Sequence, residues 1–231
     1  MARESSGTRP SEAQLRLLDT ATRVFYAEGI HSVGVDRIIA EAKVTRATFY
    51  RHFPGKDDLI LAYLRRVHEM DRTAVEAAIA GHPGPVDRLL AVAEGIAALI
   101  RSPGFRGCAF LNAAAEYPDD EHPVHQEIIA HRQWFLDTLT AQMAQVHEAT
   151  AEAAARHFVM LRDGAVAAGC LFDPALVSET FLRGVEGLLR AGTGRGPAGS
   201  GVQPASGDAP ARAARPRRTA ETRKKTAPGT A

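Results

Sequence analysis

The most restrictive feature of the sequence is the spacing of its apolar residues, which recur at intervals of three and four along most of residues 12–190. This spacing places apolar side chains on one face of an α-helix. No alternation with a period of two persists long enough to suggest a β-strand. Glycine and proline interrupt the pattern, so we predict an all-α fold with about nine helices, at residues 11–29, 35–42, 46–53, 56–80, 86–100, 109–116, 123–147, 151–170 and 174–190.

The composition is that of an ordinary globular protein, with 231 residues of which 45% are hydrophobic and 24% are charged. Two cysteines, Cys108 and Cys170, are too few for a disulfide framework and fit a reducing compartment. There is no run of about 18 uninterrupted apolar residues, which argues against a membrane-spanning helix. The first residues also lack the apolar core of a signal peptide. We therefore expect a cytoplasmic protein with no membrane partner.

Charge is distributed unevenly, although the formal net charge is only +1. Residues 1–56 carry nine basic and six acidic side chains, whereas residues 57–190 carry 11 basic and 19 acidic ones. Residues 191–231 carry eight basic and two acidic side chains and are rich in Ala, Gly, Pro and Ser. We expect this tail to be disordered, because it has too little apolar surface to fold. It acts either as a solubilising tail or as a source of non-specific, salt-sensitive affinity for DNA.

Two short helices near the N-terminus suggest a helix-turn-helix. Thr45 is the candidate N-cap of the second one, at residues 46–53, which Pro54 and Gly55 terminate. Phe49 and Phe53 lie four residues apart and therefore share one face. That face should pack onto Leu18, Phe25 and Ile38 of the preceding helices, leaving the polar face of residues 46–53 free to enter a DNA groove. We predict a flexible N-terminus at residues 1–10 and a DNA-binding domain at residues 11–55.

The polar face carries side chains suited to reading duplex DNA. Arg46 can form a bidentate contact with guanine, and small Ala47 allows close approach to base edges. Thr45, Thr48, Tyr50 and His52 can donate hydrogen bonds to phosphates or bases. Lys56 adds a positive charge at a helix N-terminus that also favours anions. The predicted DNA-binding residues are Val35, Lys43, Thr45, Arg46, Ala47, Thr48, Tyr50, Arg51, His52 and Lys56.

These residues resemble the N-terminal module of the tetracycline-repressor (TetR) type regulators. The similarity covers Gly29-Ile30 and VDRIIAEAKVTRATFYRHFPGKDDLI at residues 35–60. The chain departs from the pattern at Ile30, where an aromatic residue is usual, and at Lys43, where the turn glycine normally lies. We expect Lys43 to adopt a left-handed backbone conformation. Residues 106–126 and 158–169 are more loosely similar to the regulatory domains of some members.

The resemblance implies an all-helical homodimer in which residues 56–190 form an effector-binding and dimerisation domain. It further implies that an effector respaces the two DNA-reading helices, and that the last two helices form most of the dimer interface. The expected interface residues are Phe158, Leu161, Val166, Phe181, Val185 and Leu188. The expected pocket residues are Phe105, Cys108, Phe110, Asn112, Glu116, Trp134 and Phe135, and Tyr117 and Met143 are further candidate walls. All of these also fit an ordinary core without a ligand.

Other candidate chemistry is weak. His122, His125 and His131 lie near an acidic turn, but such acids usually cap helices and such histidines are usually solvated, so we expect no metal. Redox sensing by Cys108 is conceivable, but buried packing is the simpler interpretation. No catalytic spacing of Ser, His and Asp, and no phosphate-binding loop, stands out. We expect neither a cofactor nor an enzymatic activity.

We therefore predict a sequence-specific DNA-binding transcriptional regulator, a repressor that a small effector releases from a palindromic operator and that is nucleoid-associated when bound. Two-fold symmetry would place the operator half-sites roughly 34 Å or more apart. The alternative is an architectural DNA-binding protein without an effector.

Overall fold

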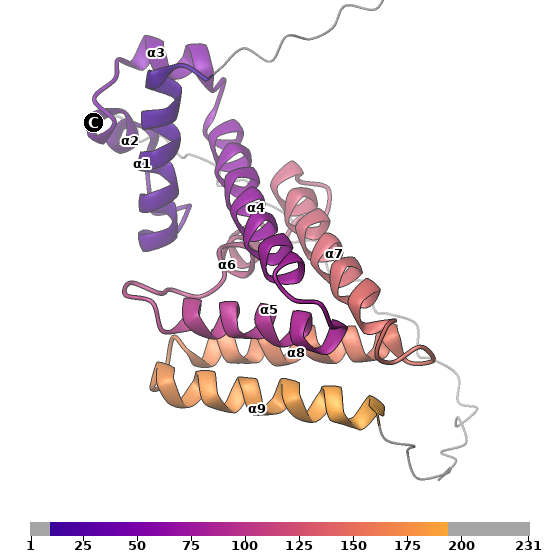
Figure 1. The fold of residues 1–231 in the computed structure, drawn as a ribbon. Helices are drawn as coiled ribbons and strands as arrows, with labels where there is room; N and C mark the ends of the chain where they lie inside the picture. The colour runs from indigo at the N-terminus through magenta and orange to yellow at the C-terminus, as the bar shows by residue number, and fades with distance from the viewer. Residues whose placement is uncertain (1–9, 194–231) are drawn as a thin grey trace, which may run out of the picture. The chain divides into compact units, whose positions relative to one another are not determined.

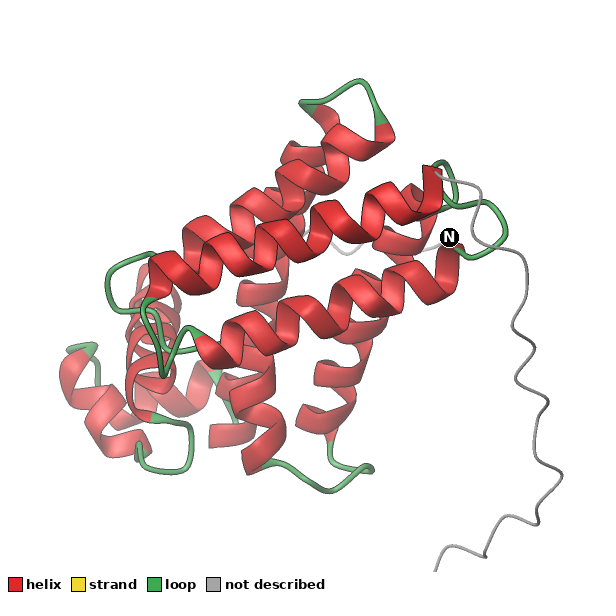
Figure 2. Ribbon diagram, turned by 90° about the horizontal axis from the view of Figure 1, so that it is seen from below, coloured by secondary structure: helices red, strands yellow, loops and turns green. Residues whose placement is uncertain are grey.

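The computed structural model describes residues 10–193, and within this range the chain forms nine helices and no strand (Figure 2). This confirms the predicted all-α fold. The predictions for residues 1–9 and for the basic tail beyond residue 193 lie outside the described residues. No helix in residues 10–193 is long and apolar enough to cross a bilayer. The helices are α1 (Glu12–Glu28), α2 (Val35–Glu41), α3 (Arg46–His52), α4 (Lys56–Ala80), α5 (Pro85–Ile100), α6 (Ala109–Glu116), α7 (Pro123–Met143), α8 (Ala151–Ala168) and α9 (Pro174–Thr193).

Local capping signals explain the helix ends near the N-terminus. The Ser11 hydroxyl accepts a hydrogen bond from the Gln14 backbone N–H at 3.2 Å, and the Thr45 hydroxyl does the same for Thr48 at 3.1 Å. Gly29 ends α1 with a φ of 90°, a conformation that L side chains rarely adopt. These ends agree with the sequence prediction.

The ends of the last three helices differ from the prediction. α7 ends at Met143 rather than at residue 147, and the chain then forms turns in which the His147 N–H donates to the Met143 carbonyl at 2.7 Å. Neither glycine nor proline marks this stop, so the sequence offered no breaker signal. α8 ends at Ala168, and α9 continues to Thr193.

The first three helices gather at one end of the long helix α4 (Figure 1). Their core contains Leu17, Val24, Phe25, Ile38 and Phe49, each at most 2% exposed. Ion pairs from Arg37 to Glu28 and from Arg23 to Glu41 join α1 to α2 on the surface, and a further pair from Arg37 to Glu41 lies within α2. Helix α1 packs directly onto the first half of α4, where the ring centres of Phe25 and Tyr63 lie 5.7 Å apart.

Helices α5, α8 and α9 lie side by side, and α7 packs against α4 and α8 (Figure 1). The Ser178 hydroxyl of α9 donates to the Ala97 carbonyl of α5 at 3.1 Å. Gly169 permits the close approach of α8 to α5, because a β-carbon there would lie 2.7 Å from Ile100 Cγ2. One continuous core therefore runs from α1 to α9.

Candidate DNA interface and ligand cavity

Helix α3 separates an apolar face from a polar one. Phe49 and Phe53 are buried, with 0% and 4% of their surface exposed, and they belong to the same core cluster as Phe25 and Ile38. The side chains of Arg46, Ala47, Tyr50 and Arg51 are exposed, as are Lys43 and Thr45. The predicted burial of the two phenyl rings is thus confirmed, and the opposite face of α3 is available to a partner.

Several polar groups of this face have partners within the protein. Arg46 forms an ion pair with Asp36 of α2, and both side chains are mostly exposed. The Thr45 and Thr48 hydroxyls hydrogen-bond to each other at 2.9 Å, and the His52 ring lies 3.0 Å from the Ser11 hydroxyl. These contacts hold the polar side chains in defined positions before any DNA is present. Val35 is half-buried at the start of α2.

Lys43 occupies the turn between α2 and α3 with a φ of 53°, the only positive φ of a non-glycine residue in residues 10–193. Its N–H donates to the Ala40 carbonyl at 3.2 Å, and the next N–H, of Val44, reaches the Ile39 carbonyl at 3.2 Å. The left-handed turn expected at the missing glycine is therefore confirmed.

Lys56 points into the protein rather than outward. Its ammonium group donates to the Ile30 carbonyl at 2.7 Å and lies 6.0 Å from the centre of the Phe25 ring. Burial lowers the pKa of Lys56, while the nearby carboxylates of Glu116 and Asp57 oppose this shift. The geometry favours a structural role, holding the α1–α2 loop, over the phosphate contact that we expected.

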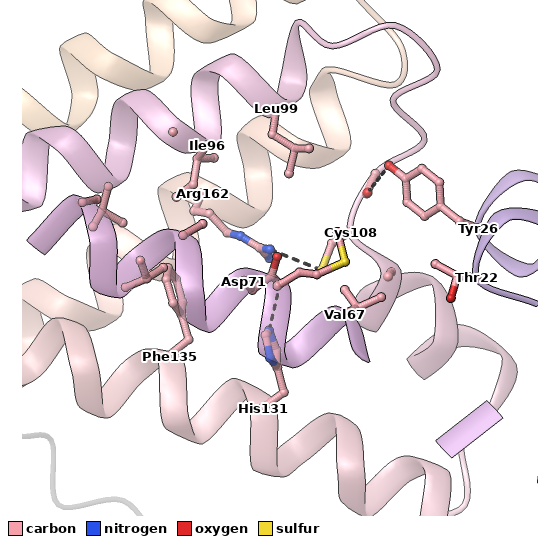
Figure 3. A pocket seen from close by; sticks show the side chains of 18 of the residues that line it. Thr22, Tyr26, Val67, Asp71, Ile96, Leu99, Cys108, His131, Phe135 and Arg162 are labelled. Atoms are coloured by element: carbon pink, nitrogen blue, oxygen red, sulfur yellow. Dashed lines mark hydrogen bonds and ion pairs between the residues drawn. The ribbon is translucent and has the colours of Figure 1, made fainter. Parts of the chain in front are cut away.

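A cavity of about 800 Å³ lies between α1, α4, α5, α6, α7 and α8 (Figure 3). Of the residues predicted to line it, Cys108, Trp134 and Phe135 do so. The remaining walls come mainly from α4 and α5. Their small and apolar residues include Val67, Met70, Ala74, Val75, Ala78, Val92, Gly95, Ile96 and Leu99.

Four predicted pocket residues lie elsewhere, which corrects that part of the prediction. Phe110 is fully buried and stacks on His131 with ring centres 3.5 Å apart. Phe105 packs beside Gly169, and the exposed Asn112 amide donates to the Arg106 carbonyl at 2.9 Å. The further candidates Tyr117 and Met143 are buried core residues outside the cavity lining.

Glu116, the fourth of these residues, binds the loop between α1 and α2. Its carboxylate accepts hydrogen bonds from the backbone N–H groups of Ile30 at 2.8 Å and His31 at 2.6 Å. A second tether comes from Tyr26 of α1, whose hydroxyl donates to the Gly107 carbonyl at 3.0 Å and accepts from the Arg106 N–H at 2.9 Å. Helix α6 therefore contacts the cavity at its first residues and the α1–α2 loop at its last.

The cavity has a polar side that sequence reasoning missed. The Arg162 guanidinium donates to the Cys108 sulfur at 3.3 Å and to the Asp163 carboxylate at 2.8 Å. His131 Nε2 lies 3.8 Å from the Asp71 carboxylate, and the His131 and His68 Nδ1 atoms lie 3.0 Å apart. The available signal for Arg162 was its place on the apolar face of α8, four residues after Phe158 and four before Val166.

Burial perturbs two of these groups. It raises the pKa of the Asp71 carboxyl, against the opposing effect of Arg162 and His68. It lowers the pKa of His131 to about 3, and the neighbouring His68, Arg162 and Arg132 act in the same direction. His131 is therefore neutral at pH 7.

The other two histidines of the suspected cluster, His122 and His125, contact the backbone at the start of α7 and in the segment before it. His122 Nδ1 accepts the Val124 N–H at 3.2 Å, and His125 Nδ1 lies 2.7 Å from the Tyr117 carbonyl oxygen. Over residues 10–193, no group of three His, Cys, Asp or Glu side chains is arranged to hold a metal ion.

Most residues predicted for a dimer interface lie inside the subunit. Phe158, Val166, Phe181 and Val185 are at most 3% exposed in the single chain, so they have almost no surface left to bury against a partner. Leu161 is 36% exposed and Leu188 is half-buried. The most exposed large apolar residues of this region are Met160 of α8, Leu171 and Phe172 of the α8–α9 turn, and Leu176 of α9.

Comparison with known proteins agrees with this architecture. Residues 17–63 match the family described as bacterial regulatory proteins, tetR family, and residues 85–157 match the tetracyclin repressor-like C-terminal domain. The crystal structure of SCO4454, a TetR-family transcriptional regulator from Streptomyces coelicolor, is 66% identical with a TM-score of 0.78, covering 79% of this chain and 97% of that one. A putative TetR regulator from Streptomyces avermitilis shares the fold at 23% identity and a TM-score of 0.63, covering 76% and 99%.

Curated relatives match over shorter stretches. The transcriptional regulator SrpR of Pseudomonas putida is 36% identical over 72 residues, which is 31% of this chain and 33% of that protein. The chain thus spans about a third of the length of this relative. From the helix-turn-helix geometry, both family matches and the likeness to SCO4454, the chain belongs to the TetR family of helix-turn-helix transcriptional regulators.

Proposed function

We propose that this protein is a homodimeric repressor that binds a palindromic operator through α3 and is released by a small effector. The observation that carries the proposal is the physical link between the cavity and the DNA-binding helices. Helix α6 lines the cavity at Cys108 and Ala109 and holds the α1–α2 loop through Glu116. A ligand that shifts α6 would therefore displace the support of the helix-turn-helix.

In this proposal, the exposed face of α3 enters the major groove. Arg46 exchanges its ion pair with Asp36 for a guanine edge, while Thr48, Tyr50 and Arg51 contact phosphates or bases. Phe49 and Phe53 fix the helix from beneath because they are buried in the core. Lys56 acts through its bond to the Ile30 carbonyl, which holds the loop that Glu116 also binds.

Coupling between the cavity and the operator is expected to be about 1–3 kcal/mol, the usual range for allosteric regulators. Two routes can carry it. Helix α4 runs from the end of α3 to the cavity wall, where Val67 and Asp71 lie. The second route is α6, with the tethers at Glu116 and Tyr26.

The proposed dimer uses the exposed apolar residues of α8, of α9 and of the turn between them. Met160, Leu171, Phe172 and Leu176 are each more than 60% exposed in the single chain. Phe172→Glu should convert the dimer to a monomer in light scattering coupled to gel filtration. A dimer that is unaffected by this change would place the interface elsewhere.

The operator can be found by selecting genomic fragments with the purified protein and footprinting the bound ones. Arg46→Ala should weaken operator binding by about 1–3 kcal/mol and weaken random DNA much less, because a base contact carries sequence preference. The control is Arg65→Ala, which removes an exposed arginine of α4 that pairs with Glu127. Equal losses on operator and random DNA would contradict the role of Arg46.

Footprinting also separates the repressor from an architectural protein. A repressor protects one discrete palindrome, whereas an architectural protein protects long stretches without preference. Deleting residues 194–231 should leave the operator preference intact. Transcription from the operator-containing promoter, with and without the protein, then separates repression from activation.

A further inference from the structure

We propose that the cavity binds a small, largely apolar molecule that carries one carboxylate-like anionic group, held by Arg162 and the N-terminus of α6. This inference builds on the proposed function, because it names the chemical class of the effector. Binding itself can be measured without DNA.

The body of the ligand must be apolar. The walls contributed by Val67, Ile96, Leu99 and Phe135 offer no hydrogen-bonding side chain, and an unpaired polar group placed against them would be left unsatisfied. The volume of about 800 Å³ accommodates a drug-sized or acyl-chain-sized molecule.

Arg162 supplies the anion contact. It lines the cavity, yet only 9% of its surface is exposed. A guanidinium has five N–H donors, and the protein engages Arg162 at Asp163 and at the Cys108 sulfur. Asp163 is also paired with Arg132, so one carboxylate serves two guanidinium groups. The deep side of the cavity therefore retains positive charge and unused donors.

The N-terminus of α6 adds to this field at the same place. Cys108 is the N-cap of α6, and its side chain makes no capping hydrogen bond. The backbone N–H groups at a helix start carry partial positive charge and favour anions. Because the Cys108 sulfur lies 3.3 Å from Arg162, the helix start and the guanidinium face one region of the cavity (Figure 3).

Few of the other titratable groups around Arg162 carry a free negative charge that would repel an anion. Asp71 of α4 is the only carboxylate in the described cavity lining, so it is the one acidic group there that opposes an anion. His131 of α7 is neutral at pH 7, since its pKa is about 3. His68 contacts His131 from α4, and Asp163 of α8 is already paired with two arginines. A cationic ligand would instead be placed beside a buried guanidinium.

The test uses the fluorescence of Trp134, which lines the cavity and is the one tryptophan of the chain. The full-length protein is titrated with decanoate, decan-1-ol and decylamine, all below their micelle concentrations. These three probes share a chain length and differ in charge. Decanoate should bind about tenfold or more tightly than decan-1-ol, because charge-assisted bonds to arginine are strong. Equal binding of decanoate and decan-1-ol, tighter binding of decylamine, or no response to any probe would overturn the inference.

Two substitutions sharpen the result. Arg162→Met should abolish the preference for decanoate over decan-1-ol. Asp71→Asn, which removes the opposing carboxylate from a partly exposed position, should increase decanoate affinity several-fold, and it keeps the test open if Arg162→Met does not fold. The control Arg65→Met, on the outer surface of α4, should change neither value. A preference that survives in Arg162→Met, or unchanged decanoate binding in Asp71→Asn, would refute the assignment.

A separate operator-release assay distinguishes this inference from the proposed function. Decanoate that quenches Trp134 selectively but leaves DNA bound would refute effector release and retain the anion site. Release of the operator by neutral compounds alone would retain effector release and refute the anion site.

Discussion

The Glu116 carboxylate is the sharpest place to test how the two parts of the protein are joined. It accepts backbone hydrogen bonds from Ile30 at 2.8 Å and His31 at 2.6 Å, and only 23% of its side-chain surface is exposed. Glu116→Ala leaves both N–H groups without this acceptor. We predict that the α1–α2 loop then opens locally, while the helices themselves remain folded.

The magnitude follows from the two bonds. A hydrogen bond to a charged group contributes about 1.5–3 kcal/mol, and water replaces part of this at a partly exposed site. We therefore expect the local opening free energy to fall by about 2–4 kcal/mol. Since 1.4 kcal/mol corresponds to a factor of ten, the Ile30 and His31 amides should exchange with solvent about 30-fold faster or more.

Amide hydrogen exchange followed by NMR measures this directly at single residues. Glu116→Gln should give an intermediate effect, because its amide oxygen can still accept one of the two bonds. Glu121→Ala, at an exposed position shortly after α6, is the matched control and should leave the loop unchanged. Exchange at Ile30 and His31 that is unchanged in Glu116→Ala would refute the tether, and with it the proposed route through α6.

Three further predictions concern stability, measured by urea unfolding. Lys43→Gly should stabilise the protein by up to about 1 kcal/mol, because Lys43 has a φ of 53° that glycine adopts without strain; a loss of stability would contradict this. Phe49→Ala should destabilise by about 3–5 kcal/mol through loss of a fully buried ring, whereas Tyr50→Ala, on the exposed face, should change the free energy of unfolding far less. The pKa of His131 is about 3 in the folded state and about 6.5 in the unfolded state. Between these pH values the unfolded chain binds a proton that the folded chain does not. Lowering the pH from 8 to 5 should therefore reduce the free energy of unfolding by about 2 kcal/mol. The raised pKa of Asp71 changes stability in the opposite direction over this range, so the comparison is with the His131→Phe variant. That variant should lose about 2 kcal/mol less stability than the wild type between pH 8 and pH 5. An identical pH dependence of the two proteins would show that His131 is not responsible.

The sequence did not predict which apolar residues line the cavity and which face a partner subunit. Phe110 and Phe135 look equivalent as aromatic residues of amphipathic segments, yet one stacks on His131 in the core and the other lines the cavity. Phe158 and Phe181 were expected at a dimer interface but contact each other inside the subunit, with ring centres 6.1 Å apart. Helical periodicity tells which face of a helix is apolar, but it does not tell whether that face meets the chain's own core, a ligand or a partner.

The sequence by itself determined the helices, their caps and the two faces of α3. These features depend on residues within one or two turns, such as Thr45 capping Thr48 and the spacing of Phe49 and Phe53, so they are present in any short window of the chain. Only the tertiary structure decided that Glu116 holds Ile30 and that Arg162 reaches Cys108. Those partners lie 86 and 54 residues apart in the chain, and their meeting depends on how whole helices pack.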